Sequence, residues 1–128
     1  MLLIAIDHVQ LGMPAGGEDR ARAFYLGVLG MREVRKPLAL AGRGGLWFAG
    51  PAGVGVHLGV EADFRPAAKA HPAFVVADLA RAREAFVTAG VSIEDDDSSL
   101  SVERCYVRDP FGNRIELVDA ADAGFSEA

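Results

Sequence analysis

The second half of this chain repeats the first, and this repeat constrains the fold more than any other feature. Residues 47–60 align without a gap with residues 106–119, so that aromatic faces aromatic, Pro faces Pro and Gly faces Gly. Within this alignment His57 faces Glu116. A stacked array needs at least three repeats to bury its core. Two repeats therefore favour one closed domain with pseudo-twofold symmetry.

Hydrophobic periodicity and turn residues predict a strand, a helix and three more strands in each half. The elements expected in the first half are, in that order, 3–13, 18–29, 31–35, 45–49 and 55–60. Those expected in the second half are 71–76, 79–89, 91–94, 103–108 and 114–119. Asp78 is a predicted helix cap, and residues 109–113 are a predicted hairpin turn. The fold class is α+β: two tandem βαβββ modules whose curved mixed sheet surrounds a concave cavity.

A chain of 128 residues is long enough for one compact domain with one sizeable core. Module one is expected at about 1–60, module two at about 71–120, and a loose tail at 121–128. The apolar residues 1–6 are expected in a buried first strand. They are too few for a membrane span and lack the basic leader of a signal peptide, so we expect a cytoplasmic protein.

Charge and cysteine content exclude several classes of function. The net charge of −5 disfavours nucleic acids and anionic membranes as partners, since both attract basic surfaces. Cys105 is the single cysteine, so the chain can form neither an internal disulfide nor a cysteine-based metal site. We interpret Cys105 as a core residue beside Val107, because no base is visibly paired with it.

Four side chains able to bind a metal occupy related positions in the repeat. His8 and His71 lie on the first strand of each half, while His57 and Glu116 face each other in the alignment. A single histidine on a strand is usually a partly buried polar residue. Here every histidine of the chain falls at a related position. Imidazole and carboxylate ligands together suit one divalent ion, with Fe(II), Ni(II), Zn(II) and Mn(II) all open.

Alternation along the strands predicts which way these side chains point. His57 lies between Val56 and Leu58, which form the apolar face of their strand, so it should point to the opposite side. Glu116 has the same relation to its apolar neighbours. Gly55 and Gly59, two residues before and two residues after His57, would leave room for a ligand.

Nearly the whole chain, from about residue 4 to residue 119, resembles the vicinal oxygen chelate superfamily, the group of glyoxalases, bleomycin resistance proteins and ring-cleaving dioxygenases. The segments that carry the resemblance are Asp-Pro-Phe-Gly-Asn-Arg-Ile-Glu-Leu at 109–117, Phe-Tyr at 24–25, Leu-Gly at 29–30, and the module openings at 6–9 and 71–74.

The resemblance implies one metal ion held by His8, His71 and Glu116, with His57 at an optional fourth position. In glyoxalase I that position is typically Glu, so its quartet is not reproduced. In ring-cleaving dioxygenases it is usually not a ligand. The triad also resembles that of the fosfomycin-resistance transferases, but no phosphonate-binding or potassium-binding loop is evident. Bleomycin-binding members lack the metal set.

The resemblance further implies a lyase, isomerase or dioxygenase that chelates two adjacent oxygens of a small substrate and stabilises an oxyanion. Glu116 would be the catalytic residue, either as a ligand or as a base. Predicted substrate contacts are Gln10, Trp47, Tyr106 and Arg108. A homodimer is expected. The alternatives are a metal-free protein that binds a small molecule or antibiotic, and a dimeric regulator without chemistry of its own.

Overall fold

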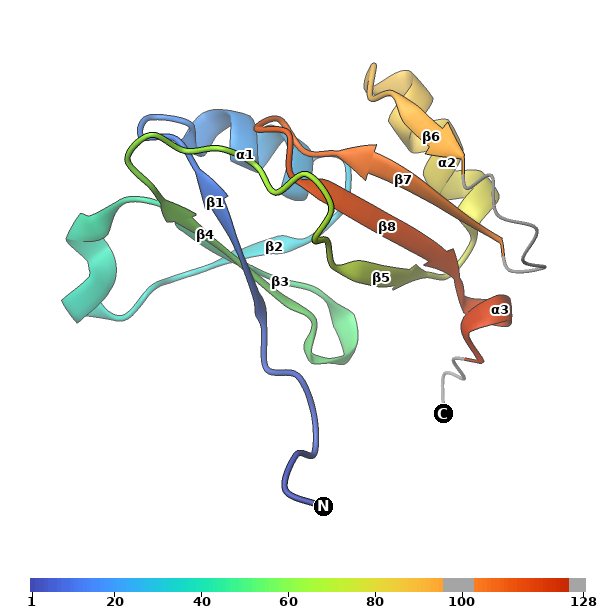
Figure 1. Ribbon diagram of the computed structural model, residues 1–128, viewed down its shortest axis with the longest axis horizontal. Coiled ribbons are helices and arrows are strands. Elements are labelled where there is room, and N and C mark those ends of the chain that lie inside the picture. Colours follow the sequence, from blue (N-terminus) through green and yellow to red (C-terminus); the bar gives the residue numbers. More distant parts are fainter. Residues whose placement is uncertain (96–102, 125–128) are drawn as a thin grey trace. The chain divides into compact units, whose positions relative to one another are not determined.

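The structure is a computed structural model that describes residues 1–95 and 103–124. It divides the chain into two compact units, Met1–Pro66 and Ala67–Ala128, and each unit contains one module of the repeat (Figure 1). The first module contains β1 (Val9–Met13), α1 (Glu18–Tyr25), β2 (Arg32–Val34), the 3-10 helix η1 (Leu38–Arg43), β3 (Leu46–Ala49), the 3-10 turn η2 (Pro51–Gly53) and β4 (Gly55–Val60). The second contains β5 (Ala73–Val76), α2 (Leu79–Thr88), β6 (Ile93–Asp95), β7 (Arg104–Arg108), β8 (Arg114–Asp119) and α3 (Ala120–Ala123).

Both modules have the same sheet topology. The strand order is β1-β4-β3-β2 in the first sheet and β5-β8-β7-β6 in the second. In each, the first strand runs parallel to the last, and the other two pairs are antiparallel. The predicted α+β class with two tandem modules is therefore confirmed, in the form of two open four-stranded mixed sheets. That the two modules form a single domain stays a prediction.

Each module buries one face of its sheet beneath a helix. In the first module, the ring of Phe48 on β3 stacks on that of Tyr25 on α1, with centroids 5.2 Å apart. Burial of one large apolar side chain contributes on the order of 1.5–3 kcal/mol. The buried apolar residues of the first module are Met13, Ala21, Phe24, Tyr25, Leu46, Phe48, Val56 and Leu58. Those of the second module are Leu79, Phe86, Cys105, Val107, Phe111, Ile115 and Leu117.

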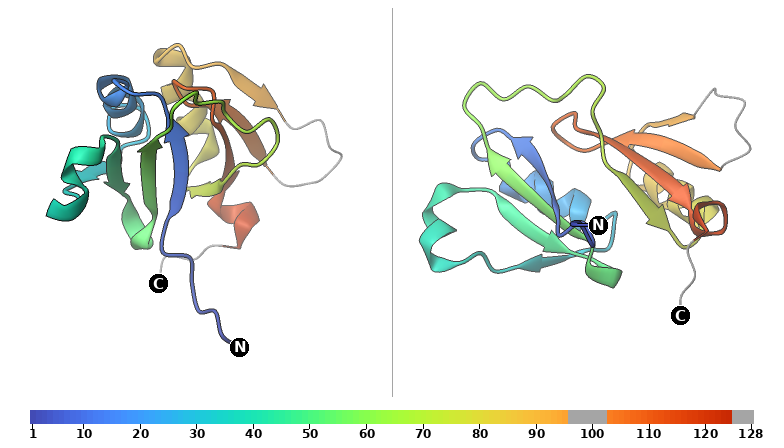
Figure 2. Two further views of the ribbon diagram at one scale, coloured as in Figure 1. Left: turned by 60° about the vertical axis from the view of Figure 1, so that its left-hand side comes forward. Right: turned by 60° about the horizontal axis from the view of Figure 1, so that its bottom comes forward.

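The first strand is shorter than predicted. We expected a buried strand from residue 3, but β1 begins at Val9, and the apolar side chains of residues 1–4 and of Ile6 are exposed. This segment runs away from the sheet of its own module (Figure 1 and Figure 2). The reason is the length of the partner strand. Val9 pairs with Val56, and β4 begins only one residue earlier, at Gly55, so residues before His8 have no strand to pair with.

The other predicted elements are present, with small shifts at their ends, whereas η1 and α3 were not predicted, and α3 replaces the start of the loose tail expected at 121–128. Helix α1 ends at Tyr25 rather than at residue 29, because the next turns are wider: the amide of Leu29 donates to the carbonyl of Phe24, five residues earlier. In the second module β5 begins at Ala73, so His71 lies just before it. Residues 120–123 form α3, and the tail residues 125–128 lie outside the described residues. None of the described helices is long and apolar enough to cross a bilayer.

Candidate functional site

The sheet registers place the predicted metal ligands at equivalent points of the two modules. The residue two positions after His8 pairs with His57 across β1 and β4. The residue two positions after His71 pairs with Glu116 across β5 and β8. Each module therefore brings together one side chain that precedes its first strand and one from the middle of its last strand.

In the second module this pairing is a direct contact. The Nε2 atom of His71 lies 3.0 Å from Oε1 of Glu116, and its Nδ1 atom lies 2.8 Å from the carbonyl oxygen of Lys69. Glu116 is only 7% exposed, and its Oε2 atom receives a long contact of 3.4 Å from Nη1 of Arg104. Both ring nitrogens of His71 thus face oxygen acceptors. Two N–H groups on His71 would satisfy both oxygens. Alternatively, Nδ1 carries the proton, and a cation takes the place of the proton on Nε2.

Tyr106 lies on the same side of the second sheet as this pair. It is the register partner of Glu116 across β7 and β8, and its ring meets the ring of His71 edge to face, with centroids 5.4 Å apart. The guanidinium of Arg114 lies 4.0 Å from the centre of the Tyr106 ring. The structure therefore brings Tyr106, one of the predicted substrate contacts, directly beside the His71–Glu116 pair.

Arg108, a second predicted substrate contact, is directed elsewhere. Its Nη1 atom donates to the carbonyl of Gly112 at 3.0 Å, and its Nε atom lies 3.8 Å from the carboxylate of Glu94. These partners belong to the hairpin turn and to the neighbouring strand β6. No contact between Arg108 and the His71–Glu116 pair is found in the described part of the chain, so its role in substrate binding stays a prediction.

In the first module the two histidines stack. The rings of His8 and His57 have centroids 3.8 Å apart and planes 15° from parallel, and Trp47 stacks on His57 at 3.9 Å and 6°. The lone pair of an imidazole nitrogen lies in the ring plane. An ion in the plane of one of two nearly parallel stacked rings lies well out of the plane of the other. In this arrangement at most one of His8 and His57 can bind a given ion.

Contacts around the stack favour His8 as that ligand. Its Nδ1 atom lies 2.7 Å from the carboxylate of Asp7, the type of contact that commonly orients a metal-binding imidazole and leaves Nε2 for the ion. His57 instead has an aromatic ring stacked against each side. Burial, and to a lesser extent the neighbouring His8, lower the pKa of His57, which keeps this ring neutral at neutral pH.

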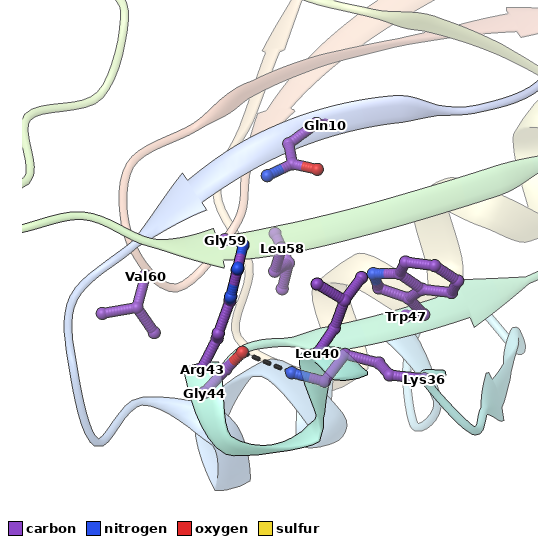
Figure 3. A pocket seen from close by; sticks show the side chains of 9 residues that line it. All are labelled: Gln10, Lys36, Leu40, Arg43, Gly44, Trp47, Leu58, Gly59 and Val60. Carbon is purple, nitrogen blue, oxygen red and sulfur yellow. Dashed lines mark hydrogen bonds between the residues drawn. The ribbon is translucent and has the colours of Figure 1, made fainter. Parts of the chain in front are cut away.

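A pocket of about 320 Å³ opens on the first module, next to Gln10 and Trp47 (Figure 3). Gln10 and Trp47 are both register partners of His57, so these three residues share one face of the sheet. The residues that line the pocket are Gln10, Lys36, Leu40, Arg43, Gly44, Trp47, Leu58, Gly59 and Val60. Gln10 and Trp47, two of the predicted substrate contacts, therefore line a pocket.

The predicted ligands are brought together in pairs within modules. Among residues 1–95 and 103–124, no three His, Cys, Asp or Glu side chains form a group that could hold a metal ion. The set of His8, His71 and Glu116, with or without His57, stays a prediction. Cys105 is fully buried, and burial raises the pKa of its thiol, in keeping with a core residue.

Sequence reasoning missed several residues with contacts at these sites, among them Asp7, Arg104, Lys36 and Arg43. Asp7 adjoins His8, and a search for carboxylates beside predicted histidine ligands would have found it. Arg104 lies two residues before Tyr106, so alternation along the strand already placed it on the same face. Lys36 and Arg43 lie in a segment without periodicity, and no signal indicated that they border a pocket.

Comparisons with known proteins agree with the fold. The family model described as Glyoxalase/Bleomycin resistance protein/Dioxygenase superfamily matches residues 5–117. A glyoxalase family protein from Bacillus anthracis is 44% identical, with a TM-score of 0.87 over 93% of this chain and 97% of that one. No curated protein matches the chain.

Two more distant structures share the fold. One is a glyoxalase/dioxygenase from Nostoc punctiforme, 23% identical, with a TM-score of 0.72 over 90% of each chain. The other is TnmS3, an antibiotic binding protein from Streptomyces sp. CB03234. It is 18% identical, with a TM-score of 0.72 over 93% of this chain and 98% of that one.

Proposed function

We propose that this chain, which belongs to the Glyoxalase/Bleomycin resistance protein/Dioxygenase superfamily, is a metal-dependent enzyme acting on a small oxygenated substrate. The superfamily includes both metalloenzymes and antibiotic-resistance proteins, so membership alone does not choose between catalysis and binding. The observation that carries the proposal is the contact between Nε2 of His71 and Oε1 of Glu116.

The spacing of this pair suits two ligands of one ion. Bonds of about 2.0–2.2 Å, as nitrogen and oxygen ligands form to zinc, separate two ligands by about 3.4 Å at a tetrahedral angle and by about 3.0 Å at the right angle of an octahedral ion. The two atoms are 3.0 Å apart. The carbonyl of Lys69 can hold the proton of His71 on Nδ1 and so leave Nε2 as a ligand. One nitrogen and one carboxylate oxygen suit Fe, Ni, Zn or Mn.

His71, Glu116 and His8 would hold the ion. Because the rings of His8 and His57 stack, we propose that His57, the optional fourth position of the family, packs against His8 and does not bind the same ion. The ion would act as a Lewis acid that accepts two adjacent substrate oxygens and stabilises developing negative charge. Glu116 is the proposed catalytic base, because its carboxylate is the proton acceptor beside this position. Tyr106, which lies beside this pair, is a proposed substrate contact, and Arg108 is retained as another.

The first test is metal content, measured by elemental mass spectrometry on untagged protein loaded in turn with Fe(II), Ni(II), Zn(II) and Mn(II). We expect about one ion per chain, with sharp losses in His71→Ala and Glu116→Gln. The matched control is Glu84→Gln, because Glu84 lies exposed on α2. Failure of all four metals to bind, or retention in Glu116→Gln with a folded circular dichroism spectrum, would refute the metal-dependent function.

A second candidate is metal-free binding of a small molecule or antibiotic, and the pocket beside Trp47 favours it. A protein that binds no metal but whose Trp47 fluorescence responds to small aromatic ligands would support this reading.

We also propose that the chain forms one domain, assembles as a homodimer and is cytoplasmic. Analytical ultracentrifugation checks the homodimer directly.

A further inference from the structure

We propose that the pocket on the first module binds the carboxylate of a small molecule whose apolar carbon skeleton lies against Trp47 and Leu40. This inference deepens the proposed function, because it names the substrate class for the face that carries His57. The pocket is nevertheless built entirely from residues 10–60, and ligand binding to it can be measured without a metal.

The charged groups at the pocket have one sign. Lys36 and Arg43 line it, and no carboxylate does. Within the part of the chain that the structure describes, neither cation forms an ion pair. Glu18 approaches the same loop, with its Oε2 atom 4.0 Å from the position of a Cβ atom on Gly44, but it does not line the cavity. The two cations therefore attract an anion from solvent, although the whole chain is acidic.

The two cations differ in what they can offer. The ammonium of Lys36 donates one hydrogen bond to the carbonyl of Gly44, which fixes its position and leaves further donors (Figure 3). The side chain of Arg43 extends from the loop toward Gly59 on β4 in the same view. A guanidinium presents a planar fork that matches the two oxygens of a carboxylate. Arg43 is therefore the principal anchor, and Lys36 adds charge.

The rest of the lining selects an apolar skeleton. The indole of Trp47 is held by its stack on His57, so that it is a rigid wall. Leu40 comes from η1 and adds an aliphatic surface. Gly59 leaves space: a Cβ atom there would run into the amide of Gln10. The glycine thus leaves room for the amide of Gln10, which is available as a hydrogen-bond partner at the edge of the cavity.

The test is a titration of chelator-treated protein with benzoate, followed through Trp47, the single tryptophan of the chain. Benzamide is the uncharged control of the same shape, and inorganic phosphate is the control for any anion. We expect saturable quenching by benzoate, weakened by salt, and little response to the other two. Arg43→Gln should raise the Kd for benzoate about tenfold or more, since it removes a charge-assisted hydrogen bond. Arg43→Lys should recover part of the affinity.

The matched control is Arg35→Gln, which removes the same charge from an exposed residue that does not line the pocket. It should leave the Kd within about twofold, because Arg35, unlike Arg43, does not line the pocket. Equal binding of benzoate and benzamide, equal effects of Arg43→Gln and Arg35→Gln, or no response to benzoate would each overturn the inference. Preferential binding of phosphate would instead assign the pocket to phosphate groups and overturn the carboxylate class. Metal content does not enter these measurements, so this failure is distinguishable from failure of the proposed function.

Discussion

The imidazole rings of His8 and His57 lie face to face, with centroids 3.8 Å apart and planes 15° from parallel. This stack gives the two histidines different roles although the repeat placed both among the predicted ligands. Because the lone pairs of two stacked rings do not converge, we propose His8 as the metal ligand and a packing role for His57 between Trp47 and His8.

The first prediction separates these two roles. His8→Ala should remove most of the bound metal, whereas His57→Phe should keep about one ion per chain, because phenylalanine preserves the flat surface against both neighbours. Elemental mass spectrometry of the two variants measures this directly, and circular dichroism checks that both are folded. Loss of metal in His57→Phe together with retention in His8→Ala would reverse the assignment.

The second prediction concerns the carboxylate that orients His8. Asp7 lies 2.7 Å from Nδ1 of His8, and loss of such a partner typically lowers metal affinity by about 10–100-fold. Asp7→Asn should therefore raise the Kd for Zn(II), measured by competition with a chromophoric chelator, without a change in stoichiometry. Asp19→Asn, which affects only an exposed ion pair with Arg22, should leave the Kd unchanged. An equal effect of both variants would indicate nonspecific electrostatics.

The strands that sequence reasoning placed best are those delimited by two independent signals. The bounds of β4 and β8 agree with the prediction at both ends, because apolar alternation and glycine or proline turns mark the same residues. The first strand was predicted too long because only one signal, its apolar pattern, supported it. Apolar residues at 1–6 satisfy a strand pattern, but a strand also needs a partner, and β4 begins only at Gly55.

Some features of the candidate site could likewise be predicted from the sequence, and others could not. The repeat and the alternation along the strand were sufficient to predict that Glu116 points to the side opposite its apolar neighbours, whereas its register with Tyr106 is known only from the structure. The stacking of His57 could not be predicted, because alternation gives the side of a sheet and not the angle between rings. The pocket cations Lys36 and Arg43 depend on how a nonperiodic loop folds back onto β4, which local patterns do not encode.

The third prediction tests the turn between β7 and β8. Asp109 is 4% exposed, and its Oδ1 atom accepts from the amides of Phe111 and Asn113, each at 2.9 Å, while Oδ2 accepts from the Asn113 side chain at 2.8 Å. Asp109→Ala leaves these buried donors unpaired and should lower the free energy of unfolding by about 1–3 kcal/mol. Asp109→Asn keeps one acceptor oxygen and should cost less. Urea denaturation of both variants checks the order, and equal losses would contradict it.

The last prediction concerns acid stability. Asp119 at the end of β8 accepts from the amide of Leu79 at 3.0 Å, where α2 begins, and from that of Ala121 at 2.9 Å, where α3 begins. These bonds lower the pKa of the Asp119 carboxyl below its ordinary value. A lowered folded-state pKa contributes stability that is fully present above the unfolded value of about 3.9 and is lost as pH falls through the folded value.

Asp119→Asn should therefore lower the melting temperature at pH 7, and the gap to wild type should narrow as the pH falls below about 4, since a protonated aspartic acid resembles asparagine. Thermal melts of both proteins across this range, followed by circular dichroism, give the gap at each pH. Because the other carboxylates titrate in both proteins, the difference between the two melting temperatures reports the contribution of Asp119 alone. A difference in melting temperature that stays constant down to pH 3 would show that the hydrogen bonds from the backbone amides of Leu79 and Ala121 to Asp119 do not depend on its charge.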